Sequence, residues 1–481
     1  MEREEVASPT VSTESTLLTG VIEAEEDREV ATCDIPNAFV QTEVSKKDRE
    51  GHRTIMKIRG ALANLLCDLD PSYTEFVVYE GKRGDIPVLY VHVLMAIYGM
   101  LISAILFYKK LVADLEAYGF AVNPYDPCVA NKIVNKKQLT VSWHVDDLKI
   151  SHAQKEMVDD FLEWITATYG SIGEVKVSRG KVHNYLGMKL DYSIKGQLSV
   201  NMVAYVETML NGFPQEDLKG AAPKAPWTEF LFKVNKSCDK LATTKAELFH
   251  TVVAQGLFLC KRGRPDIAPA IAFLTTRVKG PDRDDWSKLA KMMKYLKSTV
   301  NDVLTLRADG TRVARFHVDA AFAVHPDFRS QTGSVFTLGD GAIASISKKQ
   351  GMNTRSSTEA ELVAADEVVG SMIWTKNFLE AQGYPLKENI LFQDNQSAML
   401  LETNGRASAG KRSRHLNIRM FFVADQKAKG HIDIKYCPTD QMTGDYMTKP
   451  LHGQKFVDFR RQIMNLPMTV QLFLMAVVVV E

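Results

Sequence analysis

The chain contains the stretch Leu139-Thr140-Val141-Ser142-Trp143-His144-Val145-Asp146-Asp147-Leu148-Lys149-Ile150, which decides its fold. Apolar residues flank two adjacent aspartates, and this pattern predicts a β-hairpin with Asp146 and Asp147 at its tip. Neighbouring carboxylates in apolar surroundings repel each other and lose hydration. We therefore expect a cation, most simply a divalent metal ion, to hold them.

A third aspartate lies upstream, in Ala31-Thr32-Cys33-Asp34-Ile35-Pro36-Asn37-Ala38-Phe39. It follows a short apolar run and is far enough from the hairpin to belong to another strand of the same sheet. Three carboxylates at one end of a sheet suit two metal ions and phosphoryl transfer. A solvated hairpin turn has the same composition as the Asp-Asp pair, so the local residues leave both interpretations open.

These residues resemble the reverse transcriptase of copia-type long-terminal-repeat retrotransposon Pol polyproteins. In that family one aspartate lies in an Asp-x-x-x-Ala-Phe strand and two lie in an aromatic-Val-Asp-Asp hairpin. Further blocks with counterparts in the family extend the resemblance over residues 9–465. They include Tyr98-Gly99-Met100-Leu101, Tyr118-Gly119-Phe120, Tyr185-Leu186-Gly187-Met188, Arg264-Pro265-Asp266-Ile267 and Met293-Lys294-Tyr295-Leu296-Lys297.

The C-terminal third carries a second set of carboxylates. Arg315-Phe316-His317-Val318-Asp319 predicts a strand ending in an aspartate, and residues 333–346 predict a hairpin. Ser356-Ser357-Thr358-Glu359 is a capping box that predicts the start of a long helix. Residues 390–395 predict a strand ending at Asp394. This order of strand, hairpin, helix and strand, with acids at the strand ends, is that of an RNase H fold.

Blocks of the copia-type family match this region as Asp319-Ala320-Ala321-Phe322, residues 356–362, Asp394-Asn395-Gln396-Ser397-Ala398 and residues 444–451. The resemblance implies that Asp319, Glu361, Asp394 and Asp445 bind two metal ions and cut RNA. Glu359 is explained by helix capping, and we favour Glu361 over it. For Asp319 and Asp394 without the resemblance, we would favour an N-cap or a strand-end turn over a metal-binding role.

The resemblance also marks a nucleotide site. Tyr98 and Gly99 fall in a family block, and Phe39 matches the bulky residue that abuts the sugar of the incoming nucleotide. Ordinary core packing is the alternative for Phe39. The chain departs from the family at Leu101-Ile102-Ser103-Ala104-Ile105, where Lys-Gln-Ala-Pro-Arg is usual, and at His144, which replaces another aromatic residue.

The implied function is RNA-directed DNA polymerase with RNase H activity. The catalytic and metal-binding residues would be Asp34, Asp146, Asp147, Asp319, Glu361, Asp394 and Asp445, with Mg²⁺ or Mn²⁺ as cofactor. Expected partners are an RNA template, a DNA primer, deoxynucleoside triphosphates, an RNA–DNA hybrid and other parts of Pol, in a cytoplasmic virus-like particle or the nucleus, with no membrane. Two alternatives stay open: a non-catalytic, degraded or domesticated nucleic-acid-binding remnant, and RNase H activity alone.

Composition fits this interpretation without deciding it. The 481 residues are 45% hydrophobic and 24% charged, which is ordinary for about three globular domains. A net charge of +1 gives no overall attraction to nucleic acid, so binding would need local basic patches, for which residues 411–415 and 288–297 are candidates.

The six cysteines form no Cys-x-x-Cys pair, which favours reduced thiols and disfavours zinc. We interpret His317 and His325 as strand and loop residues.

The predicted fold is an α+β polymerase palm, thumb and connection followed by an α/β RNase H-like domain with a mixed five-stranded sheet. The predicted domains are residues 1–240 (palm, reduced fingers and start of the thumb), 241–305 (helical connection), 306–465 (RNase H-like) and 466–481 (apolar tail). The acidic start disfavours a secretory signal, and residues 470–480 are too few to span a membrane. We expect a polyprotein fragment, because the family has a long fingers segment before Asp34.

Overall fold

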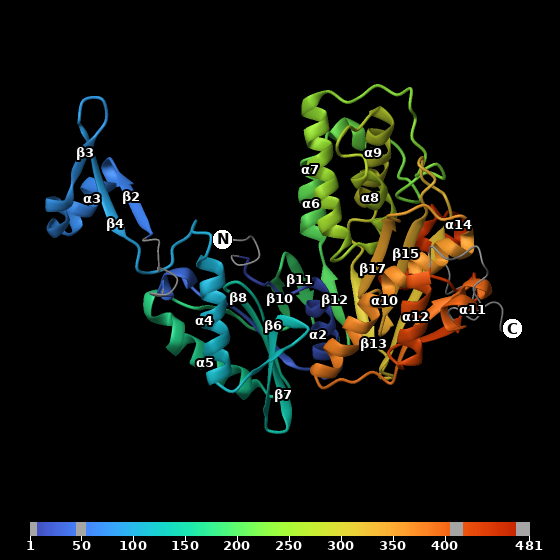
Figure 1. Ribbon diagram of the computed structural model, residues 1–481, viewed down its shortest axis with the longest axis horizontal. Coiled ribbons are helices and arrows are strands. Elements are labelled where there is room, and N and C mark those ends of the chain that lie inside the picture. The colour runs from blue at the N-terminus through green and yellow to red at the C-terminus, as the bar shows by residue number, and fades with distance from the viewer. Residues whose placement is uncertain (1–6, 45–53, 405–416, 468–481) are drawn as a thin grey trace.

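The computed structural model describes residues 7–44, 54–404 and 417–467 (Figure 1). These residues form a mixed α/β structure with four β-sheets, one of which is a mixed five-stranded sheet as the sequence predicts. The basic stretch 411–415 and the apolar stretch 470–480 lie outside the described residues. Within the described residues, no helix is long and apolar enough to cross a membrane.

The largest sheet has six strands in the order β5-β6-β7-β8-β1-β9, each antiparallel to its neighbours. Its strands are β1 (Glu29–Asp34), β5 (Ala121–Asn123), β6 (Asp126–Val134), β7 (Lys137–His144), β8 (Asp147–His152) and β9 (Lys176–Ser178). Helix α5 (Lys155–Tyr169) packs on β1 and β8, and α4 (Ser103–Ala117) packs beside β5. The short helices η1 (Ala38–Gln41) and η3 (Gly170–Ile172) follow β1 and α5.

Helix α2 (Thr13–Glu25) lies in the interior between two sheets. Its residues from Ser15 to Ala24 are buried, and it packs against strands of a second sheet. Inside this core the Glu23 carboxylate pairs with the Lys149 ammonium of β8 and accepts a hydrogen bond from Tyr192 Oη at 2.6 Å. Burial lowers the pKa of Lys149, and Glu23 opposes that shift. The lysine of the aspartate hairpin is therefore a partner of the core helix.

The second sheet has five short strands in the order β10-β11-β12-β13-β16. They are β10 (Val182–Tyr185), β11 (Met188–Asp191), β12 (Leu198–Asn201), β13 (Leu304–Ala308) and β16 (Gly339–Asp340). Between β12 and β13 the chain forms a group of mutually packed helices, which stand together in Figure 1. They are α6 (Val203–Asn211), α7 (Thr243–Cys260), α8 (Ala268–Thr275) and α9 (Arg283–Ser298), with η4 (Gln215–Leu218) and η5 (Pro265–Ile267) in the connections.

A three-stranded sheet projects from the rest of the molecule (Figure 1). It consists of β2 (Ile55–Arg59), β4 (Ile86–His92) and β3 (Val78–Glu80), with α3 (Ala61–Leu69) and η2 (Pro71–Phe76) beside it. Several large apolar side chains here face solvent, among them Leu62, Leu65 and Leu69 of α3 at 66%, 53% and 75% exposure. This unit lies in the chain between Asp34 and the Asp146-Asp147 hairpin.

The mixed sheet has the order β17-β15-β14-β18-β19. Its strands are β14 (Val313–Ala321), β15 (Gln331–Thr337), β17 (Ala344–Lys349), β18 (Glu388–Gln393) and β19 (Asp433–Tyr436). The pairs β14–β18 and β18–β19 are parallel and the others antiparallel. Helix α10 (Ser357–Ala381) packs on β14 and β15, as does the short helix α13 (Asp445–Thr448); α11 (Gln396–Asn404), α12 (Asn417–Ala428) and α14 (Gly453–Met464) complete this part.

The main hydrophobic core joins buried residues from Val11 to Met464 and includes members of the six-stranded sheet, the helical group and the mixed sheet, but not the buried residues of the three-stranded sheet. Helix α8 packs against β17 and α13, so it covers part of the mixed sheet from outside the predicted domain 306–465. Polar contacts cross the same boundary: Trp227 Nε1 donates to the Leu451 carbonyl at 2.9 Å, and Arg28 Nη2 donates to Tyr384 Oη at 2.6 Å. The domain borders stay predictions, and the C-terminal part shares its core with the rest.

The predicted basic patch at residues 288–297 is only partly available. Lys288 is buried, pairs with Asp284 at 2.9 Å and donates to the Lys233 carbonyl, so it cannot meet a nucleic acid. Its neighbours Met292, Met293, Tyr295 and Leu296 are core residues of α9.

All six cysteines are free, in agreement with the prediction of thiols.

Candidate active sites

The first candidate site lies where strands β1 and β8 end. Asp34 and Asp147 are direct partners in the antiparallel register, and the Ile35 N–H donates to the Asp146 carbonyl at 3.0 Å. Val145 has a φ of +61°, which lets the chain reverse between β7 and β8 and presents the two aspartates at the tip. The structure thus brings Asp34, Asp146 and Asp147 to one end of one sheet, as predicted.

Among the described residues, no lysine or arginine forms an ion pair with any of these three aspartates. The pKa of Asp147 is raised to about 7, mainly by burial and to a smaller extent by repulsion from Asp34 and Asp146. Burial is also the main reason that the pKa of Asp146 is raised. Three half-buried carboxylates that repel one another at one end of a sheet form a donor set that suits a hard divalent cation.

The predicted nucleotide residues lie beside these aspartates. The rings of Phe39 and Tyr98 are 4.6 Å apart between centroids, and burial together with Asp146 and Asp34 raises the pKa of Tyr98. Gly99 adopts a φ of +94°, a region that favours glycine. Leu101, where the family has lysine, is 79% exposed. Phe39 packs partly on the core, so its position suits both a contact with the nucleotide sugar and ordinary core packing.

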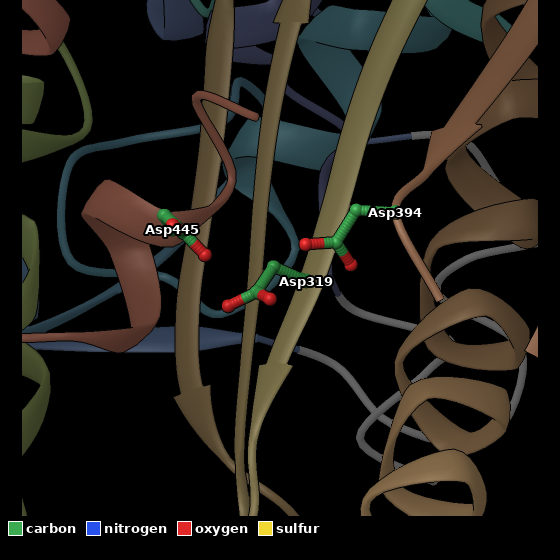
Figure 2. A group of neighbouring side chains, drawn as sticks. All are labelled: Asp319, Asp394 and Asp445. Atoms are coloured by element: carbon green, nitrogen blue, oxygen red, sulfur yellow. The ribbon is translucent and has the colours of Figure 1, made fainter. Parts of the chain in front are cut away.

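The second candidate site lies on the mixed sheet. One carboxylate oxygen of each of Asp319, Asp394 and Asp445 lies within 4.8 Å of those of the other two, and no other group of three or more acidic, histidine or cysteine residues in the described chain is this close. Figure 2 shows Asp319 between the other two. Asp319 belongs to β14, Asp394 follows β18 and Asp445 opens α13. Strand β14 continues past Asp319 to Ala321, so the aspartate is not the last residue of its strand.

Two glycines allow the close approach that brings Asp445 to Asp319. A Cβ atom on Gly333 of β15 would lie 2.5 Å from Thr448 Cγ2 and 2.8 Å from Met447 Cβ of α13. A Cβ atom on Gly444 would lie 3.0 Å from the His317 carbonyl oxygen. Helix α13 therefore sits directly on β14 and β15, and any larger residue at Gly333 would push the helix and Asp445 away.

Two lysines and a threonine near the C-terminus contact the aspartate cluster. Lys449 Nζ lies 3.3 Å from Asp319 Oδ1 and 2.5 Å from Asp445 Oδ1, and Lys455 Nζ lies 2.5 Å from Asp445 Oδ2. The Thr448 hydroxyl donates to Asp319 Oδ2. Burial and the neighbouring carboxylates raise the pKa of Asp319 to about 6, against the opposing effect of Lys449. Two ammonium groups of the chain therefore lie in contact with this cluster.

Glu361 is a buried residue of α10. Burial raises its pKa, with added repulsion from Asp319 and Asp394. The buried Gln393 links it to the site: Gln393 Nε2 donates to Glu361 Oε2 at 3.4 Å, while Gln393 Oε1 accepts from the N–H groups of Asp394 at 3.0 Å and Asn395 at 3.1 Å. One amide side chain thereby holds two of the four predicted acids.

Glu359 has the capping position that the sequence predicts. Its N–H donates to Ser356 Oγ at 3.2 Å, and its carboxylate accepts from the Arg355 N–H at 2.7 Å, one residue before the expected partner. His317 and His325 are strand and loop residues outside the cluster. His317 stacks on Phe392 and burial lowers its pKa to about 4, while His325 Nε2 contacts Gln331 Oε1 at 2.8 Å.

Four contacting residues were not predicted as site residues: Gln393, Thr448, Lys449 and Lys455. Thr448 and Lys449 stand inside a block that the sequence shares with the family, three and four residues after Asp445, and side chains at this spacing on a helix are neighbours. Gln393 immediately precedes Asp394. For Lys455 the sequence offers no such signal, because its reach depends on how α14 folds back.

The chain is similar to transposon proteins over most of its length. It is 25% identical over 465 residues to the retrovirus-related Pol polyprotein from transposon TNT 1-94 of Nicotiana tabacum, covering 94% of the chain and 32% of that polyprotein. It is 29% identical over 202 residues to the retrovirus-related Pol polyprotein from transposon RE2 of Arabidopsis thaliana, covering 42% of the chain and 14% of that protein. A putative transposon Ty5-1 protein of Saccharomyces cerevisiae is 24% identical over 281 residues, covering 56% of the chain and 86% of that protein.

No protein-family model matches the chain. The relatives nevertheless define a class: the chain is related to retrotransposon Pol polyproteins. Its homologues are of the copia type, as the sequence motifs predict. The chain spans about a third of the tobacco polyprotein and a smaller share of the Arabidopsis one.

Proposed function

We propose that the chain is an RNA-directed DNA polymerase with RNase H activity. In this proposal the six-stranded sheet is the polymerase palm, helices α6–α9 form thumb and connection, and the mixed sheet is the RNase H-like domain. The observation that carries it is the convergence of two separate carboxylate sets at family-matching positions: Asp34 and Asp147 paired across β1 and β8, and Asp319, Asp394 and Asp445 gathered on the mixed sheet.

The residues fit Mg²⁺ or Mn²⁺ at both sites. Asp34, Asp146 and Asp147 would hold the ions of the first site, and Asp319, Glu361, Asp394 and Asp445 those of the second. Bound metal ions would supply an activated attacking oxygen and charge neutralisation at the leaving oxygen. The oxygen donor sets of both sites support this assignment, because hard cations prefer carboxylate oxygens.

The chain's own residues would position the substrates. Phe39 and Tyr98 form an aromatic contact next to Asp34 and Asp146, where the sugar of a deoxynucleoside triphosphate would lie. Gln393 would fix Glu361 relative to Asp394, so that both carboxylates face the same phosphodiester of an RNA–DNA hybrid. Preorganised groups of this kind act at the moment charge develops in the transition state.

The test is made on the purified full chain, because the C-terminal part shares its core with the rest. Extension of a DNA primer on an RNA template and cleavage of a labelled RNA–DNA hybrid are measured with Mg²⁺, with Mn²⁺ and with EDTA. We expect both activities to require a divalent ion. Hybrid binding without extension or cleavage under either metal would contradict the proposal and favour a non-catalytic nucleic-acid-binding protein.

RNase H activity alone is the second candidate, and two observations favour it. The aspartates of the second site are gathered within 4.8 Å, a spacing that the first site does not reach. The exposed Leu101 stands where the family has a lysine, so a cation that could contact template or nucleotide is missing here. We therefore expect hybrid cleavage to be the more readily detected of the two activities, and cleavage without any extension would select this candidate.

Phe39→Ala should relax the discrimination between deoxyribonucleotides and ribonucleotides. Removing the ring opens the space that a 2′-hydroxyl would need, so the deoxy-to-ribo ratio of kcat/KM should fall about tenfold or more. The ratio is measured in primer extension with matched dTTP and UTP. Phe230→Ala, which truncates a 53% exposed phenylalanine, is the control. An unchanged ratio in Phe39→Ala would assign Phe39 to core packing.

A further inference from the structure

The Lys449 ammonium sits among the carboxylates of the second site. It contacts Asp319 Oδ1 at 3.3 Å and Asp445 Oδ1 at 2.5 Å, so it bridges two of the three aspartates that converge there. Figure 2 shows how closely these two carboxylates face each other. A positive charge of the chain thus offsets the repulsion that would otherwise separate Asp319 and Asp445.

Hydrogen bonds fix the backbone of Lys449, whereas its side chain is partly exposed to solvent. The Lys449 N–H donates to the Asp445 carbonyl at 3.0 Å, and the preceding Thr448 hydroxyl donates to Asp319. The Lys449 side chain, in contrast, is 40% exposed. Its ammonium can therefore leave the carboxylates for solvent without unpacking α13.

A divalent cation and the ammonium compete for the same oxygens. Divalent ions bind carboxylate oxygens at about 2.0–2.6 Å, and a lysine bridging those oxygens would lie close enough to repel the ion strongly. We infer that Lys449 is an internal counter-ion of the second site: it holds Asp319 and Asp445 together before the metal binds, and the incoming divalent cation displaces it. This inference rests on the proposed function and adds a residue to that site.

Lys455 provides a matched comparison within the same cluster. Its ammonium contacts Asp445 Oδ2, the other oxygen of that carboxylate, and also donates to the Thr439 carbonyl at 3.1 Å. It makes no ion pair with Asp319. Lys455 therefore neutralises Asp445 from outside the space between the aspartates, and a metal ion in that space would leave it in place.

The first experiment measures Mn²⁺ affinity by isothermal titration calorimetry on the full chain. Every protein carries Asp147→Asn, which weakens the first site so that the heat reports the second. Lys449→Met keeps the length of the side chain and removes the competing charge, and we expect about tenfold tighter Mn²⁺ binding. Lys455→Met should change the affinity less. Lys435→Met, which removes a charge paired with Glu388 at the edge of the same sheet, should leave it unchanged.

The second experiment separates displacement from simple charge loss. In EDTA, Lys449→Met should lower Tm by about 2 °C or more, because Asp319 and Asp445 then repel each other. Saturating Mn²⁺ should remove this deficit, since the metal takes over the role of the ammonium. A deficit of Lys455→Met should persist in Mn²⁺, because that lysine is not displaced.

The outcomes distinguish this inference from the proposed function. Equal Mn²⁺ affinity in the parent and Lys449→Met, at a site that Asp394→Asn abolishes, would overturn the counter-ion role and leave the metal site standing. A Tm deficit of Lys449→Met that persists in Mn²⁺ would overturn it as well. If neither protein binds Mn²⁺ at an Asp394-dependent site, the counter-ion role and the proposed metal site both fail.

Discussion

Asp394→Asn should lower the rate of RNA cleavage in an RNA–DNA hybrid by about a thousandfold or more. Asp394 follows β18, and one of its carboxylate oxygens lies within 4.8 Å of those of Asp319 and Asp445. Asparagine keeps the size of the side chain and removes one negative charge from the shared set. Metal binding and neutralisation of the transition state are then weakened together. Single-turnover cleavage of a labelled hybrid by the full chain measures the effect.

Two further variants show whether the loss is specific. Asp440→Asn makes the same change at an exposed residue near the site, and we expect it to cleave like the parent. Asp147→Asn should abolish primer extension and leave cleavage intact, because Asp147 belongs to the other sheet. Asp394→Asn should in turn leave extension intact. Such a double dissociation would assign each carboxylate set to one reaction.

Cleavage by Asp394→Asn at the parent rate would contradict the assignment. The three aspartates would then be a structural remnant held by Lys449 and Lys455, and this result would favour a non-catalytic nucleic-acid-binding protein. Loss of both reactions in either variant would instead indicate that the substitution disturbs the shared core. Circular dichroism and Tm of each variant decide between a local and a global effect.

Local pattern was enough to predict most of the elements that carry the acids, although not the short helix that begins at Asp445. The hairpin at Asp146-Asp147, the strand at Asp34 and the helix beginning after Ser356 all follow from alternation, turn composition and capping within a few residues. The pairing of Asp34 with Asp147 needed one further step, that both strands belong to one sheet. The structure places them as direct partners. The structure also contains the mixed five-stranded sheet that the sequence predicts.

What the sequence did not predict depends on contacts between distant segments. Lys449 reaches Asp319 only because Gly333 lets α13 lie directly on β15. A single glycine in a strand gives no hint of which helix approaches it. The basic run at residues 288–297 looked like a surface patch, yet Lys288 is buried because α9 packs with the neighbouring helices. Charge patterns alone do not show which face of a helix is covered.

The shared core is the largest unpredicted feature. The C-terminal acids come from elements within residues 319–445, which suggests a self-contained domain. The structure instead covers β17 with α8 and ties α13 and α14 to the helical group through Asp266. Apolar surface that helices of another segment cover cannot be identified from the segment itself.

Asp266→Ala should destabilise the full chain by about 3–5 kcal/mol, because it leaves a buried arginine without its partner. Asp266 is fully buried and accepts hydrogen bonds from Arg264 Nε and Nη2, both at 2.9 Å, and from Tyr295 Oη at 2.6 Å. Arg460 of α14 lies 3.4 Å from the same carboxylate, and Tyr446 of α13 donates to the Asp266 carbonyl at 2.9 Å. Chemical denaturation followed by tryptophan fluorescence measures the loss.

The control is Asp239→Ala, which removes the ion pair between Asp239 and Arg283. Because these two side chains are 75% and 73% exposed, the substitution should lower the free energy of unfolding by less than about 1 kcal/mol.

Arg264 and Arg460 hold the pKa of Asp266 below its usual range, against the effect of burial. A lowered folded pKa means that the stabilisation by the charge is complete above the unfolded pKa of about 4 and is lost only as the pH falls toward the folded pKa. The difference in the free energy of unfolding between the parent and Asp266→Ala should therefore be the same at pH 7 and pH 5. If this difference shrinks between the two pH values, or if Asp266→Ala loses no more stability than Asp239→Ala, this carboxylate does not tie the helical group to the mixed sheet.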